Sequence, residues 1–218
     1  MQQNKPNYQS FLLKKIEEIK KDGKKPSLLL HVCCGPCSTT CLEILAEYFV
    51  VTALFYNPNI HPEKEYLKRY DELKKFIKIK NQNLKDKIKI KEVDYDCELY
   101  FEKIKGLENE KEGGKRCEKC FELRLEKTAQ LCKKDKFDYF TTTLTVSPYK
   151  NSNLLNNIGN SLAEKYNIKF LNSDFKKNDG YKKSILISKQ FDLYRQEYCG
   201  CIYSLKEREN YIKKQKND

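Results

Sequence analysis

The stretch LLLHVCCGPCS, residues 28–38, joins an apolar run to three cysteines and a Gly-Pro pair. Its apolar half is typical of a buried strand over residues 27–32. The segment 38–48 begins with hydroxyl side chains, which favour the N-terminus of a helix. A buried strand that leads at once into a helix predicts a parallel α/β sheet. The loop between the two is where a phosphate-binding protein usually has glycines, and here it holds Cys33, Cys34 and Cys37.

The alternation of strands and helices continues along the chain. Further strands are expected at VVTALFY, KIKIKEVDY, FDYFTTTL and IKFLNSDF, residues 50–56, 87–95, 137–144 and 168–175. Helices are expected over residues 8–21, 63–80, 97–106, 117–134 and 153–166. This pattern predicts an α/β fold with a mostly parallel sheet of about five strands covered by helices. We expect a single domain over 1–218, in which a C-terminal helical segment, about 180–215, returns a Cys-Gly-Cys motif to the site.

The composition limits the partners and the compartment. The 218 residues include 43 Lys and Arg against 31 Asp and Glu, a net charge of +12, which favours a polyanion such as nucleic acid. The lysines are spread along expected helices, however, so charge alone leaves that question open. No span approaches the roughly 18 apolar residues of a membrane helix, so we expect a soluble, cytoplasmic protein without a membrane partner. Ten cysteines in a reducing compartment then indicate metal or redox chemistry rather than disulfides.

Seven of the cysteines fall into three tight groups. They are Cys33, Cys34 and Cys37, then Cys117 and Cys120, then Cys199 and Cys201. A Cys-x-x-Cys pair at a helix start can hold one metal centre, and a compact sheet can bring distant groups together. Seven thiolates exceed the four that one zinc ion or one cubane cluster needs, which makes two centres plausible. Cys41, Cys97 and Cys132 stand alone and are expected to be small buried hydrophobes.

Two other functions fit the same cysteines. The first is a zinc-stabilised nucleic-acid-binding module without catalysis, although zinc ribbons and fingers use local pairs rather than the end of a first sheet strand. The second is a thiol–disulfide oxidoreductase that uses CGPC, residues 34–37. That function needs one thiol pair and leaves the other two groups unexplained.

Several longer stretches resemble one known family. They are HVCCGPCS, FYNPNIHP, RCEKCFELRLEKTA, TTTLTVSPYKN, DFKKNDGY and LYRQEYCGCIYS, and in this order they cover residues from about 27 to 204. The chain resembles the cobalamin-independent epoxyqueuosine reductases of the QueH type. That resemblance implies an adenine-nucleotide α-hydrolase-like (HUP-like) fold whose cysteine loop replaces a glycine-rich phosphate loop. It also implies reduction of epoxyqueuosine to queuosine at the tRNA wobble position, with electrons from a donor that the sequence does not identify.

The resemblance further implies a [4Fe–4S] cluster beside a mononuclear iron. Because side chains of adjacent residues diverge, we expect neighbouring cysteines to serve different metals. The cluster ligands are then expected to be Cys33, Cys117, Cys120 and Cys199. The single iron, at the catalytic position, would be held by Cys34, Cys37 and Cys201.

Other polar residues are candidates for the substrate or for protons. Tyr149, Lys150 and Asn151 follow an expected strand, and the Arg195 guanidinium suits a phosphate; all four are candidate substrate contacts. For His31, a hydrogen-bonded place in the core is favoured over ligation, and His61 is a candidate for orienting its loop. Asp94 and Asp96 are candidate proton donors, but aspartates at strand ends more often cap helices.

Overall fold

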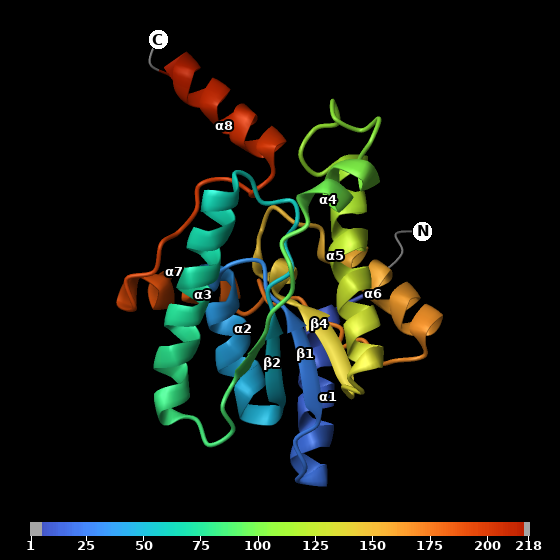
Figure 1. The fold of residues 1–218 in the computed structure, drawn as a ribbon. Coiled ribbons are helices and arrows are strands. Elements are labelled where there is room, and N and C mark those ends of the chain that lie inside the picture. The colour runs from blue at the N-terminus through green and yellow to red at the C-terminus, as the bar shows by residue number, and fades with distance from the viewer. Residues whose placement is uncertain (1–5, 216–218) are drawn as a thin grey trace.

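The computed structural model describes residues 6–215, which include a sheet of four parallel strands (Figure 1). The order across the sheet is β3-β2-β1-β4. The strands are β1 (Ser27–His31), β2 (Val50–Leu54), β3 (Lys89–Lys91) and β4 (Tyr139–Thr142). Both neighbours of β1 pair with it in parallel, and β3 pairs in parallel with β2. The predicted α/β class with a parallel sheet is therefore confirmed.

The segment 168–175, predicted as a fifth strand, forms only one bridge, between Phe170 and Phe140. The Phe140 N–H donates to the Lys169 carbonyl at 3.0 Å, and the Leu171 N–H donates to the Phe140 carbonyl at 2.9 Å. Beyond that point side chains, rather than a neighbouring strand, bond to the backbone. For example, the Ser173 N–H donates to Asn156 Oδ1 at 3.0 Å. The ladder ends because its hydrogen-bonding groups already have other partners.

Eight α-helices lie in the described part of the chain. They are α1 (Tyr8–Asp22), α2 (Gly35–Tyr48), α3 (Glu63–Asn83), α4 (Cys97–Lys103), α5 (Lys115–Lys134), α6 (Ser152–Tyr166), α7 (Gly180–Gln190) and α8 (Ile202–Gln215). Helix α2 starts before the predicted Ser38 because Cys34 is its N-cap, with Sγ accepting from Cys37 N–H at 3.2 Å. The Ser38 hydroxyl instead donates to the Gly35 carbonyl at 2.6 Å, inside the helix. Cys37 therefore belongs to the first turn of α2.

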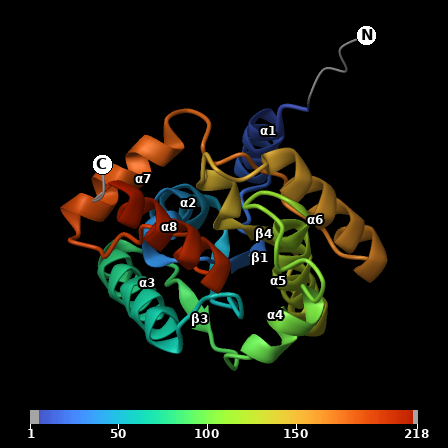
Figure 2. The same ribbon diagram turned by 90° about the horizontal axis from the view of Figure 1, so that it is seen from above.

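Two apolar cores lie on opposite faces of the sheet. Alternate residues of β1 point to opposite faces, so Leu28 and Leu30 join one core and Leu29 joins the other. Helices α1, α2 and α3 contribute buried side chains to the first core, and α5 and α6 contribute to the second. Figure 2 shows these helices arranged around the sheet. The two covered faces leave the strand ends as the place for a site.

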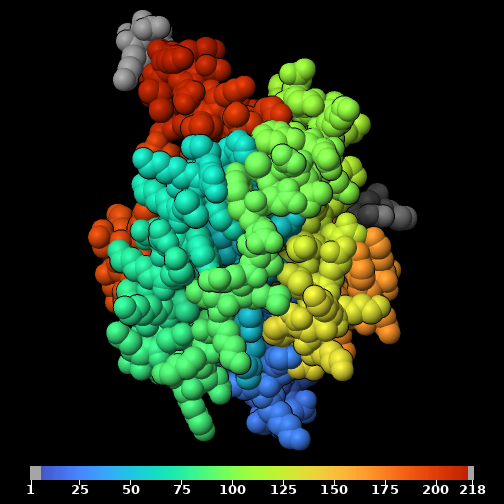
Figure 3. Space-filling model, viewed as in Figure 1, coloured from blue at the N-terminus to red at the C-terminus, as the bar shows by residue number. Residues whose placement is uncertain are grey.

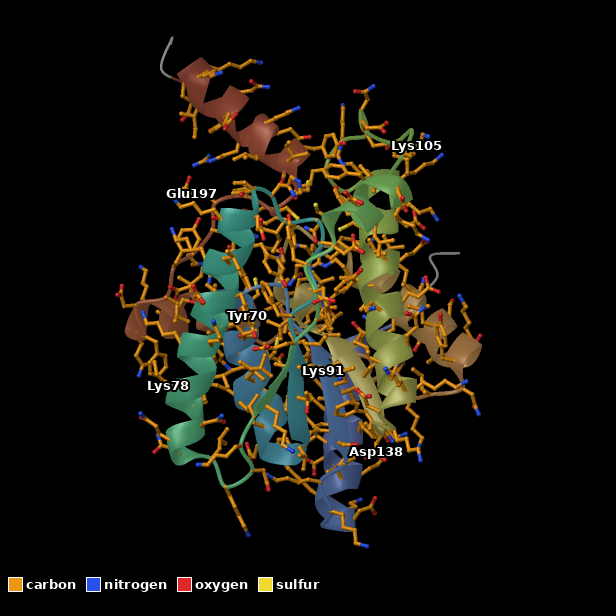
Figure 4. The ribbon with its side chains drawn as sticks, viewed as in Figure 1. Tyr70, Lys78, Lys91, Lys105, Asp138 and Glu197 are labelled. Carbon is orange, nitrogen blue, oxygen red and sulfur yellow. The ribbon has the colours of Figure 1, made fainter. Side chains whose placement is uncertain are left out.

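The two ends of the sheet differ in what surrounds them. Asp138, just before β4, lies at the lower end of the molecule in Figure 4, and Glu197, in the segment before α8, lies at the upper end. Helix α8 and the segment around α4 stand at this same upper end in Figure 3. Within residues 6–215, no helix has the length and apolar character needed to span a membrane.

Candidate metal centre and substrate cavity

The first cysteine group lies between the end of β1 and the start of α2. The sulfur atoms of Cys33, Cys34 and Cys37 all lie within 4.8 Å of one another. The two adjacent sulfurs, of Cys33 and Cys34, are 3.9 Å apart. The expected divergence of these neighbours is therefore not observed, because the turn before α2 brings both sulfurs to the same place. Their division between two metals stays a prediction.

Electrostatics make Cys33 the most acidic of the three thiols. Hydrogen bonds from the Cys34 and Cys37 thiols hold the pKa of Cys33 well below its ordinary value, and Lys150 and Arg124 act in the same direction. Burial raises the pKa of Cys34 to about 12. Hydrogen bonding to Cys33 and Cys34 raises the pKa of Cys37 well above its ordinary value. Metal ligation requires thiolates, so a cation bound here would displace the thiol protons.

The second group combines α5 with the C-terminal segment. Cys117 and Cys120 lie in the first two turns of α5, and Cys120 packs with Cys201 in a small core that includes Tyr100. Burial raises the pKa of Cys117 to about 11 and that of Cys120 to about 12, and the nearby Cys199 and Cys201 thiols add to both shifts. The fold thus brings Cys117 and Cys120 near Cys199 and Cys201, which follow about 80 residues later in the sequence. Among the described residues, however, the ligand atoms of three cysteines lie within 4.8 Å of one another only at Cys33, Cys34 and Cys37.

A buried arginine holds the Cys-Gly-Cys segment in place. Arg69 of α3 is 2% exposed, and it donates to the Cys199 carbonyl at 3.0 Å and to the Tyr198 carbonyl at 3.2 Å. Its Nε donates to Glu65 at 2.7 Å. Gly200 has φ +126°, and a Cβ there would lie 2.9 Å from Arg69 Nη1. Only glycine therefore fits between the two cysteines while Arg69 keeps its bonds.

The loop that His61 is expected to orient contacts the same segment. The His61 N–H donates to the Gly200 carbonyl at 2.7 Å, and the Tyr198 hydroxyl donates to the His61 carbonyl at 2.6 Å. The Tyr95 hydroxyl lies 3.0 Å from Nδ1 of the His61 ring. His61 therefore contacts the Cys-Gly-Cys segment through its backbone.

A cavity of about 530 Å³ opens beside the cysteines. Three of the seven grouped cysteines line it, together with four cations and three tyrosines: Cys33, Cys37, Cys199, Arg69, Arg124, Lys150, Arg195, Tyr149, Tyr181 and Tyr198. Burial acts to lower the pKa of Lys150, but the nearby Cys199, Cys33 and Cys37 thiols raise it above its ordinary value. Lys150 therefore stays protonated. The four cations of the cavity outnumber its two carboxylates, Glu112 and Glu197, which favours an anionic ligand.

Three of the four candidate substrate residues line this cavity. Tyr149 is 80% exposed. Arg195 donates to the Ser184 carbonyl at 3.3 Å and to Ser188 Oγ at 3.2 Å, which ties it to α7. Asn151 is not among the lining residues. Its Oδ1 caps α6 by accepting from two backbone N–H groups, at 3.0 and 3.2 Å.

The remaining candidate residues make contacts within the fold rather than with the cavity. His31 Nδ1 accepts from the Thr142 hydroxyl at 2.8 Å and Nε2 donates to the Tyr56 carbonyl at 3.2 Å, while burial lowers its pKa to about 3. His31 is therefore the hydrogen-bonded, neutral core histidine that the sequence favours over a metal ligand. Asp96 caps α4 through Leu99 N–H at 3.3 Å. Cys41 and Cys132 are fully buried, and Cys97 is half-buried at the first position of α4.

Arg124 and Gln196 also face the cysteines, and sequence reasoning missed both. Arg124 is 2% exposed, donates to Asn57 at 2.5 Å and reaches Cys120 Sγ at 3.9 Å. Its Nε is buried without a partner in the described structure. Such a guanidinium is stabilised by negative charge nearby. Seven thiols and a buried cation with a free N–H together fit a metal–sulfur group that carries negative charge.

The fold and the site define a class of protein: a parallel α/β domain with a cysteine cluster that can hold a metal, at the end of the sheet where this architecture binds small ligands. A model of the family described as "Epoxyqueuosine reductase QueH" matches residues 28–207. A Streptococcus pyogenes serotype M1 protein is 43% identical over 202 residues, which are 93% of this chain and 79% of that protein. A Staphylococcus epidermidis protein is 42% identical over 206 residues, 94% of this chain and 87% of its own. A Haemophilus influenzae protein is 43% identical over 199 residues, which are 90% of this chain and 78% of that protein.

Each of these three relatives is named epoxyqueuosine reductase QueH. The chain belongs to the QueH family of epoxyqueuosine reductases. The family name denotes an oxidoreductase, which agrees with a site built from thiols.

Proposed function

We propose that this protein reduces epoxyqueuosine to queuosine in tRNA. The observation that carries the proposal is the meeting of a cysteine triad, a cation-lined cavity and the Cys-Gly-Cys segment at one end of the sheet, in a chain of the QueH family. The net charge of +12 suits a polyanionic substrate. Because the proposed substrate is a tRNA, the proposal includes a cytoplasmic location.

The reaction converts an epoxide into an alkene. Both carbon–oxygen bonds of the epoxide break, a carbon–carbon double bond forms, and the oxygen leaves as water. Two electrons and two protons are consumed. Protein side chains supply no such electrons, so the proposal requires a metal group and an external electron donor.

The seven grouped cysteines are the proposed ligands of that metal group. A [4Fe–4S] cluster with an adjacent iron, once bound, would supply single electrons and a Lewis acid for the oxygen. Cys33, Cys117, Cys120 and Cys199 are proposed for the cluster, with Cys34, Cys37 and Cys201 for the iron. The mutual proximity of the Cys33, Cys34 and Cys37 sulfurs supports thiolate ligation, and so does the packing of Cys120 against Cys201.

The remaining cavity residues bind and orient the substrate. Lys150 and Arg195 offer positive charge to an anionic group of the tRNA, and the bonds of Arg195 to α7 fix its direction. The exposed ring of Tyr149 offers a face on which a base can stack. Protonated Lys150 also carries a proton at Nζ near Cys33 and Cys199, and it is the proposed donor of one of the two protons that the oxygen takes up.

The test is anaerobic reconstitution of the full chain with iron and sulfide, followed by nucleoside analysis of epoxyqueuosine-containing tRNA incubated with the protein and a reductant. Formation of queuosine supports the proposal. Colourless protein that takes up only zinc supports the nucleic-acid-binding module instead. A protein that keeps its activity after Cys117 and Cys120 are replaced supports a dithiol oxidoreductase based on Cys34 and Cys37.

A further inference from the structure

Gln196 reaches the cysteine triad from the far end of the chain. Its Nε2 lies 3.0 Å from Cys34 Sγ and 3.8 Å from Cys37 Sγ. The residue lies 162 positions after Cys34 in sequence and lines the cavity. The amide N–H can therefore donate to a sulfur that the site proposal uses as a metal ligand.

Residues on both sides of Gln196 are held by hydrogen bonds. On one side Arg195 is bonded to Ser184 and Ser188 of α7. On the other side the Tyr198 carbonyl accepts from Arg69 at 3.2 Å. With its neighbours held in this way, the Gln196 side chain is directed at Cys34 and Cys37.

Cys34 Sγ receives two N–H donors. The backbone N–H of Cys37 donates at 3.2 Å and Gln196 Nε2 donates at 3.0 Å. Cys34 is fully buried, so solvent contributes little to its stabilisation. Each hydrogen bond from an N–H group draws negative charge away from the sulfur. Hydrogen bonds to sulfur are one of the factors that set the reduction potential of iron held by thiolates.

The other end of the Gln196 amide supports a functional role. Its Oε1 is buried and has no hydrogen-bond partner among the described residues. A buried carbonyl without a partner costs stability, because folding removes its hydrogen bonds to water without replacing them. A side chain chosen only for packing would avoid that cost, whereas a donor aimed at a thiolate accounts for it.

We infer that Gln196 is a positioning residue that raises the reduction potential of the metal group bound through Cys34. The amide N–H stabilises the thiolate charge that increases on reduction, so the reduced form becomes easier to reach. The inference rests on the proposed function only in requiring a redox-active metal group at Cys34.

The test compares the reconstituted full chain with Gln196→Leu and Gln196→Glu. Leucine removes the donor, and glutamate replaces it with a negative carboxylate of the same shape. The matched control is Gln130→Glu, at an exposed glutamine of α5. Midpoint potentials come from a spectroscopic redox titration, with iron and sulfide counted in each sample.

We expect Gln196→Leu to lower the equilibrium constant for reduction of the metal group at least tenfold. For a one-electron couple, that change makes the midpoint potential about 59 mV more negative. Gln196→Glu should shift the potential further in the same direction, and Gln130→Glu should leave it unchanged. Wild-type potentials in both Gln196 variants at full metal content would overturn the inference. Loss of all iron in both variants would overturn it too, because Gln196 would then serve assembly instead. A wild-type protein that binds no redox-active iron would overturn the proposed function itself.

Discussion

Replacing Arg69 tests whether one buried side chain holds the Cys-Gly-Cys segment at the site. In Arg69→Met the volume is roughly kept, but the bonds to the Tyr198 and Cys199 carbonyls and to Glu65 are lost. The side chain of Arg69 is 2% exposed and that of Glu65 is 12% exposed, so water replaces these partners poorly.

The magnitude follows from the groups left behind. Removing one partner of a buried ion pair typically costs about 3–5 kcal/mol, because the other charge stays buried and unpaired. Glu65 keeps one partner, since the Tyr194 hydroxyl lies 3.2 Å from its carboxylate. We therefore expect the free energy of unfolding to fall by about 3–4 kcal/mol, at the lower end of that range.

Urea unfolding of the reduced, metal-free protein measures this loss. The matched control is Arg208→Met, because Arg208 pairs with Glu197 at 3.0 Å while their side chains are 37% and 70% exposed. That substitution should cost at most about 1 kcal/mol. Arg69→Met should also bind less iron after reconstitution, because Cys199 loses its fixed backbone. A loss no larger than that of Arg208→Met, with full iron content, would refute the reasoning.

Three further predictions concern the metal ligands, the sheet and the substrate. Cys120→Ala should lose the cubane absorption, whereas Cys201→Ala should keep it and lose queuosine formation; iron and sulfide counts that fall equally in both would show the ligand division to be wrong. Asp138 accepts from Ser27 Oγ and N–H at 2.7 Å, and these bonds lower its pKa, so its contribution is present above the ordinary value of 3.8 and is lost as pH falls below it. Asp138→Asn should cost about 1 kcal/mol near pH 7 and progressively less toward about pH 3 in urea unfolding, and a constant difference would count against this account. Binding of epoxyqueuosine-containing tRNA should weaken steeply between about 50 and 200 mM salt in a filter-binding titration, and an unchanged affinity would argue against phosphate contacts.

Local patterns were sufficient for most elements of the fold. Apolar runs of strand length between helical segments predicted β1, β2 and β4, because burial on both faces of a parallel sheet requires such runs. The start of α2 was misplaced, since a cysteine took the capping role expected of Ser38. The strand expected at 168–175 was reduced to one bridge by side chains of other elements. Both differences arise from contacts that no local pattern contains.

The sequence by itself determined the parallel α/β class, the cysteine groups and the family, because each depends on residue type and short spacing. The tertiary structure alone decided which side chains surround those cysteines. Arg69 lies in a charged helix and Gln196 in a polar segment, where nothing in composition distinguishes them from solvent-facing neighbours. Their partners are 130 and 162 residues away along the chain. Such contacts depend on how α3, the start of α2 and the C-terminal segment pack at one end of the sheet, so their geometry is a property of packing rather than of local sequence.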